Sequence, residues 1–279
     1  MRKFPFPLLL FALALLSAAP TPLSILKPVI SDMEDGPGVP PSFTFVPGQF
    51  IFLSYEVAGY KVSDEQKIHL SYKTDAFDPK GVRLVETDAN VLDTTLSEED
   101  KNWKPKMRHQ ILIPPLAPSG VYKIAIQVTD DLNKTGTASQ ELKFAVRGHE
   151  VEPSGELAVR NFHFYRGEDD REPLTTAAYK PGDTLWARFD IVGYRFGEHN
   201  SVNVDYGIAV LAPSGKVLFA QEKAAEEKSY SFYPKPYVPG SMNLDLQKTI
   251  RPGNYAIAIT VRDHTGNQTC EAKGTFTVE

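Results

Sequence analysis

Apolar and polar residues alternate with a period of two along most of the chain. In residues 122–128 the apolar positions are Tyr122, Ile124, Ile126 and Val128, and residues 255–261 repeat the pattern. Successive side chains of a β-strand point to opposite faces of the sheet, so this alternation predicts strands with one buried face. Turn-forming pairs such as Pro47-Gly48 and Pro181-Gly182 separate the runs. Only residues 97–103 and 224–228 have a pattern that favours short helices.

The chain contains an internal repeat. Residues 23–84 align with residues 157–218 without a gap, at a constant offset of 134 residues. After small changes in length, residues 120–130 also match residues 253–263. Repeated units of this size predict separate domains, each with its own core. We therefore expect domains at 23–148 and 156–279, joined by a linker at 149–155.

The N-terminus has the three parts of a secretory signal peptide. Arg2 and Lys3 precede an apolar run from Leu8 to Leu16, and small residues follow at 17–19. The apolar run is far shorter than the ~20 residues that span a bilayer. We expect residues 1–19 to be a signal peptide, residues 20–22 a short leader, and the protein to be exported to the periplasm or outside the cell.

Composition narrows the classes of partner. The formal net charge is −5, and removal of residues 1–19 would make it −7. An acidic chain without a cluster of basic residues is unsuited to nucleic acid. No segment after the signal peptide is long and apolar enough to span a membrane. The one cysteine, Cys270, excludes an intrachain disulfide, and its strand context predicts a buried or half-buried side chain rather than a reactive thiol.

Two turns show a family resemblance. Leu116-Ala-Pro-Ser-Gly-Val-Tyr122 and Ile250-Arg-Pro-Gly-Asn-Tyr255 resemble the corner that leads into strand F of fibronectin type III and bacterial immunoglobulin-like domains. The resemblance implies an all-β fold, with two tandem immunoglobulin-like β-sandwiches after the signal peptide. It also implies that Tyr122 and Tyr255 are structural, each with its hydroxyl bonded to backbone a few residues upstream. Gly59 and Gly193, at matching positions of the repeat, are expected to be structural as well.

Motifs of catalysis are missing from the sequence. It has no Gly-x-Ser-x-Gly, no His-Glu-x-x-His and no phosphate-binding glycine loop. We therefore expect a non-enzymatic module that binds a protein partner or serves in adhesion at the cell envelope. A carbohydrate-binding module, an enzyme and a purely architectural spacer are the alternatives.

Aromatic residues supply the candidate binding surface. Tyr230, Phe232, Tyr233 and Tyr237 lie in a proline-rich stretch, and Trp103 lies in the corresponding region of the first unit. Exposed aromatic rings stack on sugars or anchor protein interfaces. The alternative is that some of these rings cover the edge of a sandwich.

Acidic residues suggest a cation site between the domains. In the expected topology Glu34 and Asp35 of the first domain approach Asp263 and Asn267 of the second. Oxygen ligands of this kind suit calcium. The alternative is that Asp263 and Asn267 only cap a hairpin turn. No other cofactor is expected.

Overall fold

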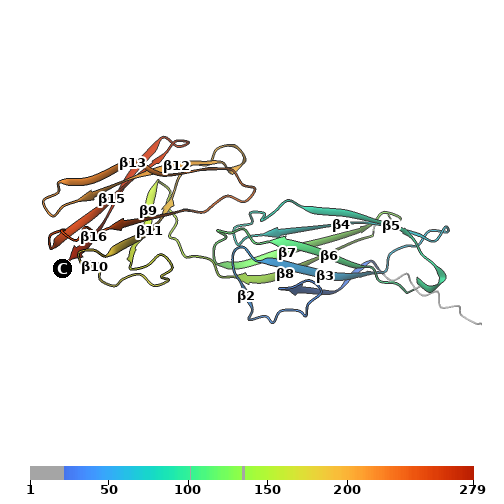
Figure 1. Cartoon of the computed structure of the whole chain (residues 1–279). Helices are drawn as coiled ribbons and strands as arrows, with labels where there is room; N and C mark the ends of the chain where they lie inside the picture. The colour runs from blue at the N-terminus through green and yellow to red at the C-terminus, as the bar shows by residue number, and fades with distance from the viewer. Residues whose placement is uncertain (1–21, 101, 134–135) are drawn as a thin grey trace, which may run out of the picture.

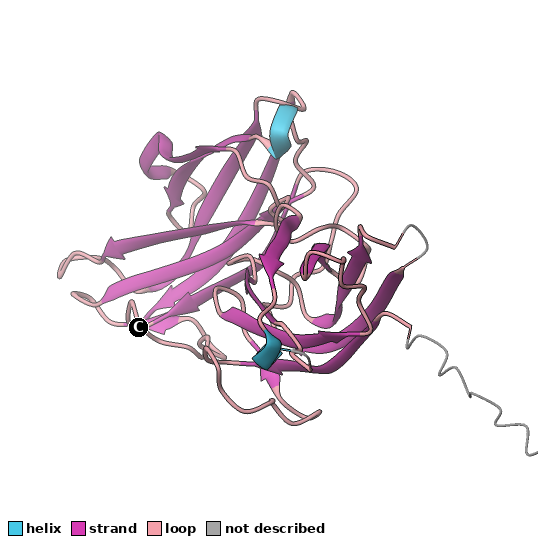
Figure 2. Cartoon of the chain, turned by 90° about the vertical axis from the view of Figure 1, so that its right-hand side faces the viewer, coloured by secondary structure: helices cyan, strands magenta, loops and turns pink. Residues whose placement is uncertain are grey.

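The computed structural model describes residues 22–100, 102–133 and 136–279. These residues form two β-sandwiches placed end to end, coloured blue to green and yellow to red in Figure 1. Strands dominate the described chain, and its helical part consists of two 3-10 turns, Glu98–Asp100 and Glu198–Asn200 (Figure 2). The all-β fold predicted from the alternation is confirmed. The predicted signal peptide, and residues 20 and 21 of the leader, lie outside the described residues.

The first sandwich packs a three-stranded sheet against a five-stranded one. The sheet orders are β1-β3-β6 and β2-β8-β7-β4-β5. Neighbouring strands are antiparallel except for β2 and β8, which run parallel. The strands are β1 (Ser24–Ser31), β2 (Thr44–Phe45), β3 (Phe50–Ala58), β4 (Lys67–Phe77), β5 (Asp88–Thr95), β6 (Lys106–Leu112), β7 (Gly120–Asp130) and β8 (Thr137–Val146).

The second sandwich repeats this topology. Its sheet orders are β14-β11-β9 and β10-β16-β15-β12-β13, which match the first sandwich strand for strand. The strands are β9 (Ala158–Tyr165), β10 (Ala178–Tyr179), β11 (Thr184–Val192), β12 (Val202–Leu211), β13 (Val217–Ser229), β14 (Val238–Asp245), β15 (Gly253–Asp263) and β16 (Gln268–Val278). The repeat in the sequence is thus a repeat in topology.

Each sandwich has its own apolar interior. On β7 the side chains of Tyr122, Ile124, Ile126 and Val128 are at most 2% exposed, and β15 has the same alternation. Full burial of one such side chain is worth about 1.5–3 kcal/mol. Because the chain has a single cysteine, these interiors rather than a disulfide hold the sandwiches. Cys270 is half-buried, as predicted, and burial raises the pKa of its thiol.

Tyrosine corners close both sandwiches. The Tyr122 hydroxyl donates to the Pro118 carbonyl over 2.7 Å, and the Tyr255 hydroxyl donates to the Arg251 carbonyl over 2.8 Å. Each ring is buried while its hydroxyl satisfies a backbone acceptor upstream. The upstream backbone bonds expected of these two hydroxyls are present.

Gly59 and Gly193 turn the chain at the ends of β3 and β11. Both have left-handed φ angles, 77° and 73°. A Cβ atom on Gly193 would lie 1.9 Å from the Glu156 carbonyl oxygen, so no other residue fits there. The predicted structural role of both glycines follows from this geometry.

One predicted helix is wrong and the other is reduced to a single turn. Residues 224–228 belong to β13, where Ala225–Lys228 pairs with Asn203–Tyr206 of β12. Pairing with a neighbouring strand outweighs the helix propensity of the Ala- and Glu-rich segment. Among the described residues of 97–103, Glu98–Asp100 is the helical part.

Candidate functional site

The predicted aromatic stretch forms much of the junction between the sandwiches. Tyr233 is 8% exposed and belongs to the apolar cluster of the first sandwich. Its hydroxyl donates to Asp78 Oδ2 over 2.9 Å, and burial raises the pKa of Tyr233. The other oxygen of Asp78 accepts the backbone N–H groups of Lys80 and Val82. The junction is therefore a buried and hydrogen-bonded contact that extends the core of the first sandwich.

The linker makes a second contact with the second sandwich. His149 Nε2 lies 2.7 Å from Asp190 Oδ2, and the Asn161 amide donates to the same oxygen over 2.8 Å. The His149 ring packs on Tyr237 with 5.3 Å between ring centroids. Burial raises the pKa of Tyr237, which is 7% exposed. Towards the first sandwich, the Gly148 N–H donates to Ser119 Oγ. The start of the linker is thus bonded to both sandwiches.

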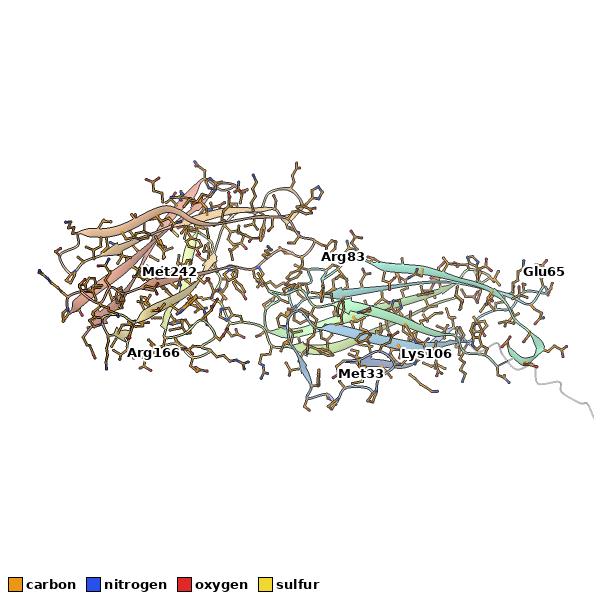
Figure 3. The ribbon with its side chains drawn as sticks, in the orientation of Figure 1. Met33, Glu65, Arg83, Lys106, Arg166 and Met242 are labelled. Carbon is orange, nitrogen blue, oxygen red and sulfur yellow. The ribbon has the colours of Figure 1, made fainter. Side chains whose placement is uncertain are left out.

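These positions correct part of the predicted binding surface. Tyr233 and Tyr237 are buried because they fill the junction, so their rings are not offered to a ligand. Tyr230 is 81% exposed and Phe232 45% exposed, with the Arg83 guanidinium 5.8 Å from the Phe232 ring centre. Arg83 lies at the end of the first sandwich that faces the second (Figure 3).

Trp103 lies at the opposite end of the first sandwich. Thr95 pairs with Lys67, so the loop that follows β5 starts at the end where Figure 3 shows Glu65. The Trp103 side chain is 39% exposed, and its carbonyl accepts the Tyr60 hydroxyl over 2.6 Å. The structure therefore does not bring Trp103 and the 230–237 stretch together.

The four predicted calcium ligands are also separate. Asp35 pairs with Lys106 and Arg108, at 2.8 and 3.0 Å, and these bonds lower the pKa of Asp35 to about 2. Among the described residues there is no group of three or more His, Cys, Asp or Glu side chains placed to hold a metal. Glu34 and Asp35 therefore do not form a ligand cluster with Asp263.

Asp263 instead caps its hairpin, which was the alternative. It is 1% exposed and accepts the N–H groups of Arg195, Thr265 and Gly266 and the Gln268 amide. Asn267 occupies a left-handed turn position with φ 50°. In the first sandwich Asp130 caps the hairpin as Asp263 does in the second, because its carboxylate accepts the Lys61 and Leu132 N–H groups.

An exposed edge strand is the feature that sequence reasoning missed. β13 is the last strand of its five-stranded sheet, and its residues 217–223 are all exposed. Val217, Leu218 and Phe219 are 52%, 54% and 47% exposed. Tyr230 follows the other end of the strand. A row of unpaired backbone groups beside apolar side chains is a template for strand pairing. The signal in the sequence was the apolar triplet directly after the Pro213-Ser-Gly215 turn.

The described residues include no helix that is long and apolar enough to cross a bilayer.

Comparisons with known proteins assign the chain to no family. No protein-family model matches the chain, and no curated protein matches it in sequence. Among solved structures, it resembles the C-terminal domain of the AgI/II polypeptide BspA from Streptococcus agalactiae. That match has 11% identity and a TM-score of 0.33, and it covers 92% of this chain and 100% of the other.

Two enzymes show similarly weak likenesses. Red sea bream transglutaminase matches at 9% identity and a TM-score of 0.28 over 94% of this chain, which spans 32% of that enzyme. A family 123 glycoside hydrolase from Clostridium perfringens matches at 12% identity and a TM-score of 0.29, over 44% of this chain and 27% of that enzyme. Likenesses of this strength carry no argument about activity.

Proposed function

We propose that the chain is an exported, non-enzymatic binding module that recognises a protein partner along the free edge of β13. The observation that supports this proposal is the exposed edge itself. An extended segment of a partner adds a strand through backbone hydrogen bonds, and the side chains beside the edge set its specificity. Here Val217, Leu218 and Phe219 supply apolar contacts at one end of the strand, and Tyr230 supplies one beyond the other end.

The remainder of β13 limits indiscriminate pairing. Its second half carries Glu222, Lys223, Glu226, Glu227 and Lys228, and the pairing with β12 is irregular between Gln221 and Ala225. Charges and bulges on an edge strand hinder non-specific association. The segment most suited to a partner is therefore 217–221, and the partner segment is expected to be extended and apolar.

The junction fixes the position of the β13 edge relative to the first sandwich. The Tyr233–Asp78 bond and the His149–Asp190 contact hold the second sandwich against the first. A rigid scaffold lowers the entropy cost of presenting a surface. The proposed role of the first sandwich is to present the β13 edge at a defined position.

A pull-down from envelope extract with the chain lacking residues 1–19 tests the proposal, with Leu218→Asp/Phe219→Asp as the variant. Both side chains are about half exposed, so the variant should fold and melt like the wild type. A specific partner should be captured by the wild type and lost by the variant. A matched control is Val91→Asp, because Val91 lies on β5, the equivalent edge strand, and is 56% exposed. Equal capture by all three proteins would contradict the proposal.

A glycan ligand is the second candidate, and it rests on Tyr230. A ring that is 81% exposed can stack on a sugar face. Glycan-array binding that is lost in Tyr230→Ala but kept in Leu218→Asp/Phe219→Asp would favour this alternative over a protein partner.

A further inference from the structure

The second sandwich carries a large groove over the outer face of the β14-β11-β9 sheet. Its volume is about 880 Å³, and its floor includes Ser241 of β14 and Asp190 of β11. The linker, through His149, closes one end, and the loop after β9, through Arg171, forms a wall. Small-molecule sites typically measure about 300–1,000 Å³ and often lie at domain boundaries. The groove has both properties.

The equivalent face of the first sandwich has a smaller hollow. It measures about 110 Å³ and lies over the β1-β3-β6 sheet beside Arg108. There the loop after β1 folds over the sheet, and Asp35 pairs with both Lys106 and Arg108. The basic side chains of that face are therefore neutralised by a carboxylate of the protein itself.

The basic side chains of the groove are not neutralised in this way. Arg188 donates to the backbone carbonyls of Glu168 and Asp170 and lies over the Tyr165 ring, 4.3 Å from its centre. Carbonyl oxygens orient a guanidinium but leave its positive charge uncompensated. Within the part of the chain that the structure describes, the side chains of Arg171 and His163 have neither a hydrogen bond nor an ion pair, although both residues line the groove.

Two carboxylates line the groove, and one of them is already bonded. Asp190 is 5% exposed and already bonds His149 and Asn161. Glu150 is the other carboxylate of the lining. The acidic residues 168–170 and 172 share the loop of Arg171 but do not line the groove. Arg171 and Arg188 therefore place two guanidinium groups on the wall of the groove, beside the His163 ring.

We propose that this groove binds a small organic anion, whose carboxylate or phosphate group lies between Arg171 and His163. Guanidinium groups recognise both anions through paired, charge-assisted hydrogen bonds. Arg188, fixed by its carbonyl partners, adds positive charge without having to move. Ser241 and Asn161 offer polar groups to the uncharged part of the ligand. The site is separate from the β13 edge, so the two proposals stand or fall independently.

Isothermal titration of the chain lacking residues 1–19 tests the site with four probes: glucuronate, glucose 6-phosphate, inorganic phosphate and glucose. We expect at least one of the three anions to bind, more weakly as salt rises, and glucose not to bind. Glucuronate alone would identify a carboxylate ligand, and the two phosphates together a phosphate ligand. No binding of any anion at millimolar concentration, or equal binding of glucose and glucuronate, would overturn the proposal.

Variants locate the binding. Arg171→Gln should lower the affinity for the anion about tenfold or more, because a charge-assisted hydrogen bond contributes on that scale. His163→Gln should also weaken anion binding. Lys67→Gln is the matched control, since it removes the same charge from an exposed residue of the first sandwich. Affinity that falls equally in Lys67→Gln and Arg171→Gln, or in neither, would show that the groove is not the site. Leu218→Asp/Phe219→Asp should bind the anion like the wild type.

Discussion

The two sandwiches share their strand order and turn devices, yet they differ in one layer of the core. In the first sandwich His109 points inward from β6 and bonds the hydroxyls of Tyr55 and Thr74, each at 3.2 Å. Its Nδ1 donates to Asp88 at 2.5 Å. The matching residues of the second sandwich are Phe189, Ile208 and Met242, and Figure 3 labels Met242.

The difference teaches that the fold needs side chains that fill this layer of the core, and that these side chains can be polar or apolar. The polar cluster keeps its groups bonded, and burial raises the pKa of Tyr55. The apolar version fills the same space with no polar group to satisfy. A buried polar network is stable only while all of its members are paired, so the first sandwich should be the more sensitive to single changes in this layer.

The largest effect should come from the device that both sandwiches share. Asp263→Ala leaves three partly buried backbone N–H groups without their acceptor, and we expect a loss of about 4 kcal/mol. Asp130→Ala should cost about as much in the first sandwich. Denaturant unfolding followed separately in each sandwich measures both values. Losses below about 1 kcal/mol would mean that the carboxylates do not hold the turns.

The polar layer gives the next effect. His109→Met removes the partner of two buried hydroxyls and should destabilise the first sandwich by about 2 kcal/mol. The triple change Tyr55→Phe/Thr74→Ile/His109→Met copies the second sandwich and should recover most of that loss. Chemical unfolding of the single and triple variants is the test. A triple variant less stable than the single one would show that the two layers are not interchangeable.

The junction gives a smaller effect. Tyr233→Phe removes the donor to Asp78 Oδ2 and keeps the ring in the core, so we expect a loss of about 1 kcal/mol from the first sandwich. The equivalents of Asp78 and Arg83 in the second sandwich are Ala212 and Val217, so its outer end has no such acceptor. Calorimetry of Tyr233→Phe should show the first sandwich melting earlier while the second is unchanged. An equal shift in both would contradict this assignment.

The smallest effect concerns pH. The pKa of Asp35 is lowered from 3.8 to about 2 by its bonds to Lys106 and Arg108. A lowered pKa means that the ion pairs stabilise the folded chain above about pH 4, and that this contribution is lost as the pH falls towards 2. The melting temperature of Asp35→Asn should therefore approach that of the wild type between pH 4 and 2. Glu34→Gln is the neighbouring control, and an Asp35 that titrates near 3.8 by NMR would refute the prediction.

The alternating residues and the repeat were enough to predict the sandwiches, because burial of one strand face is a local pattern. The tyrosine corners and Gly59 and Gly193 were also readable, since each role depends on a few neighbouring residues. The buried state of Tyr233 was not readable, because its partner Asp78 lies 155 residues earlier in the chain. A signal for it existed: Asp78 is matched by apolar Ala212 in an otherwise well-aligned repeat. The helix predicted for residues 224–228 was wrong because their composition favours a helix, whereas β12 supplies a strand partner.

The most direct test of the account is the rotational diffusion of the two sandwiches, measured by ¹⁵N relaxation on the chain lacking residues 1–19. Because Tyr233 is buried in the first sandwich and His149 bonds the second, both halves should report one common diffusion tensor. Tyr233→Ala should separate them into two tensors. Independent tumbling of the halves in the wild type would contradict a locked tandem and remove the fixed setting proposed for β13.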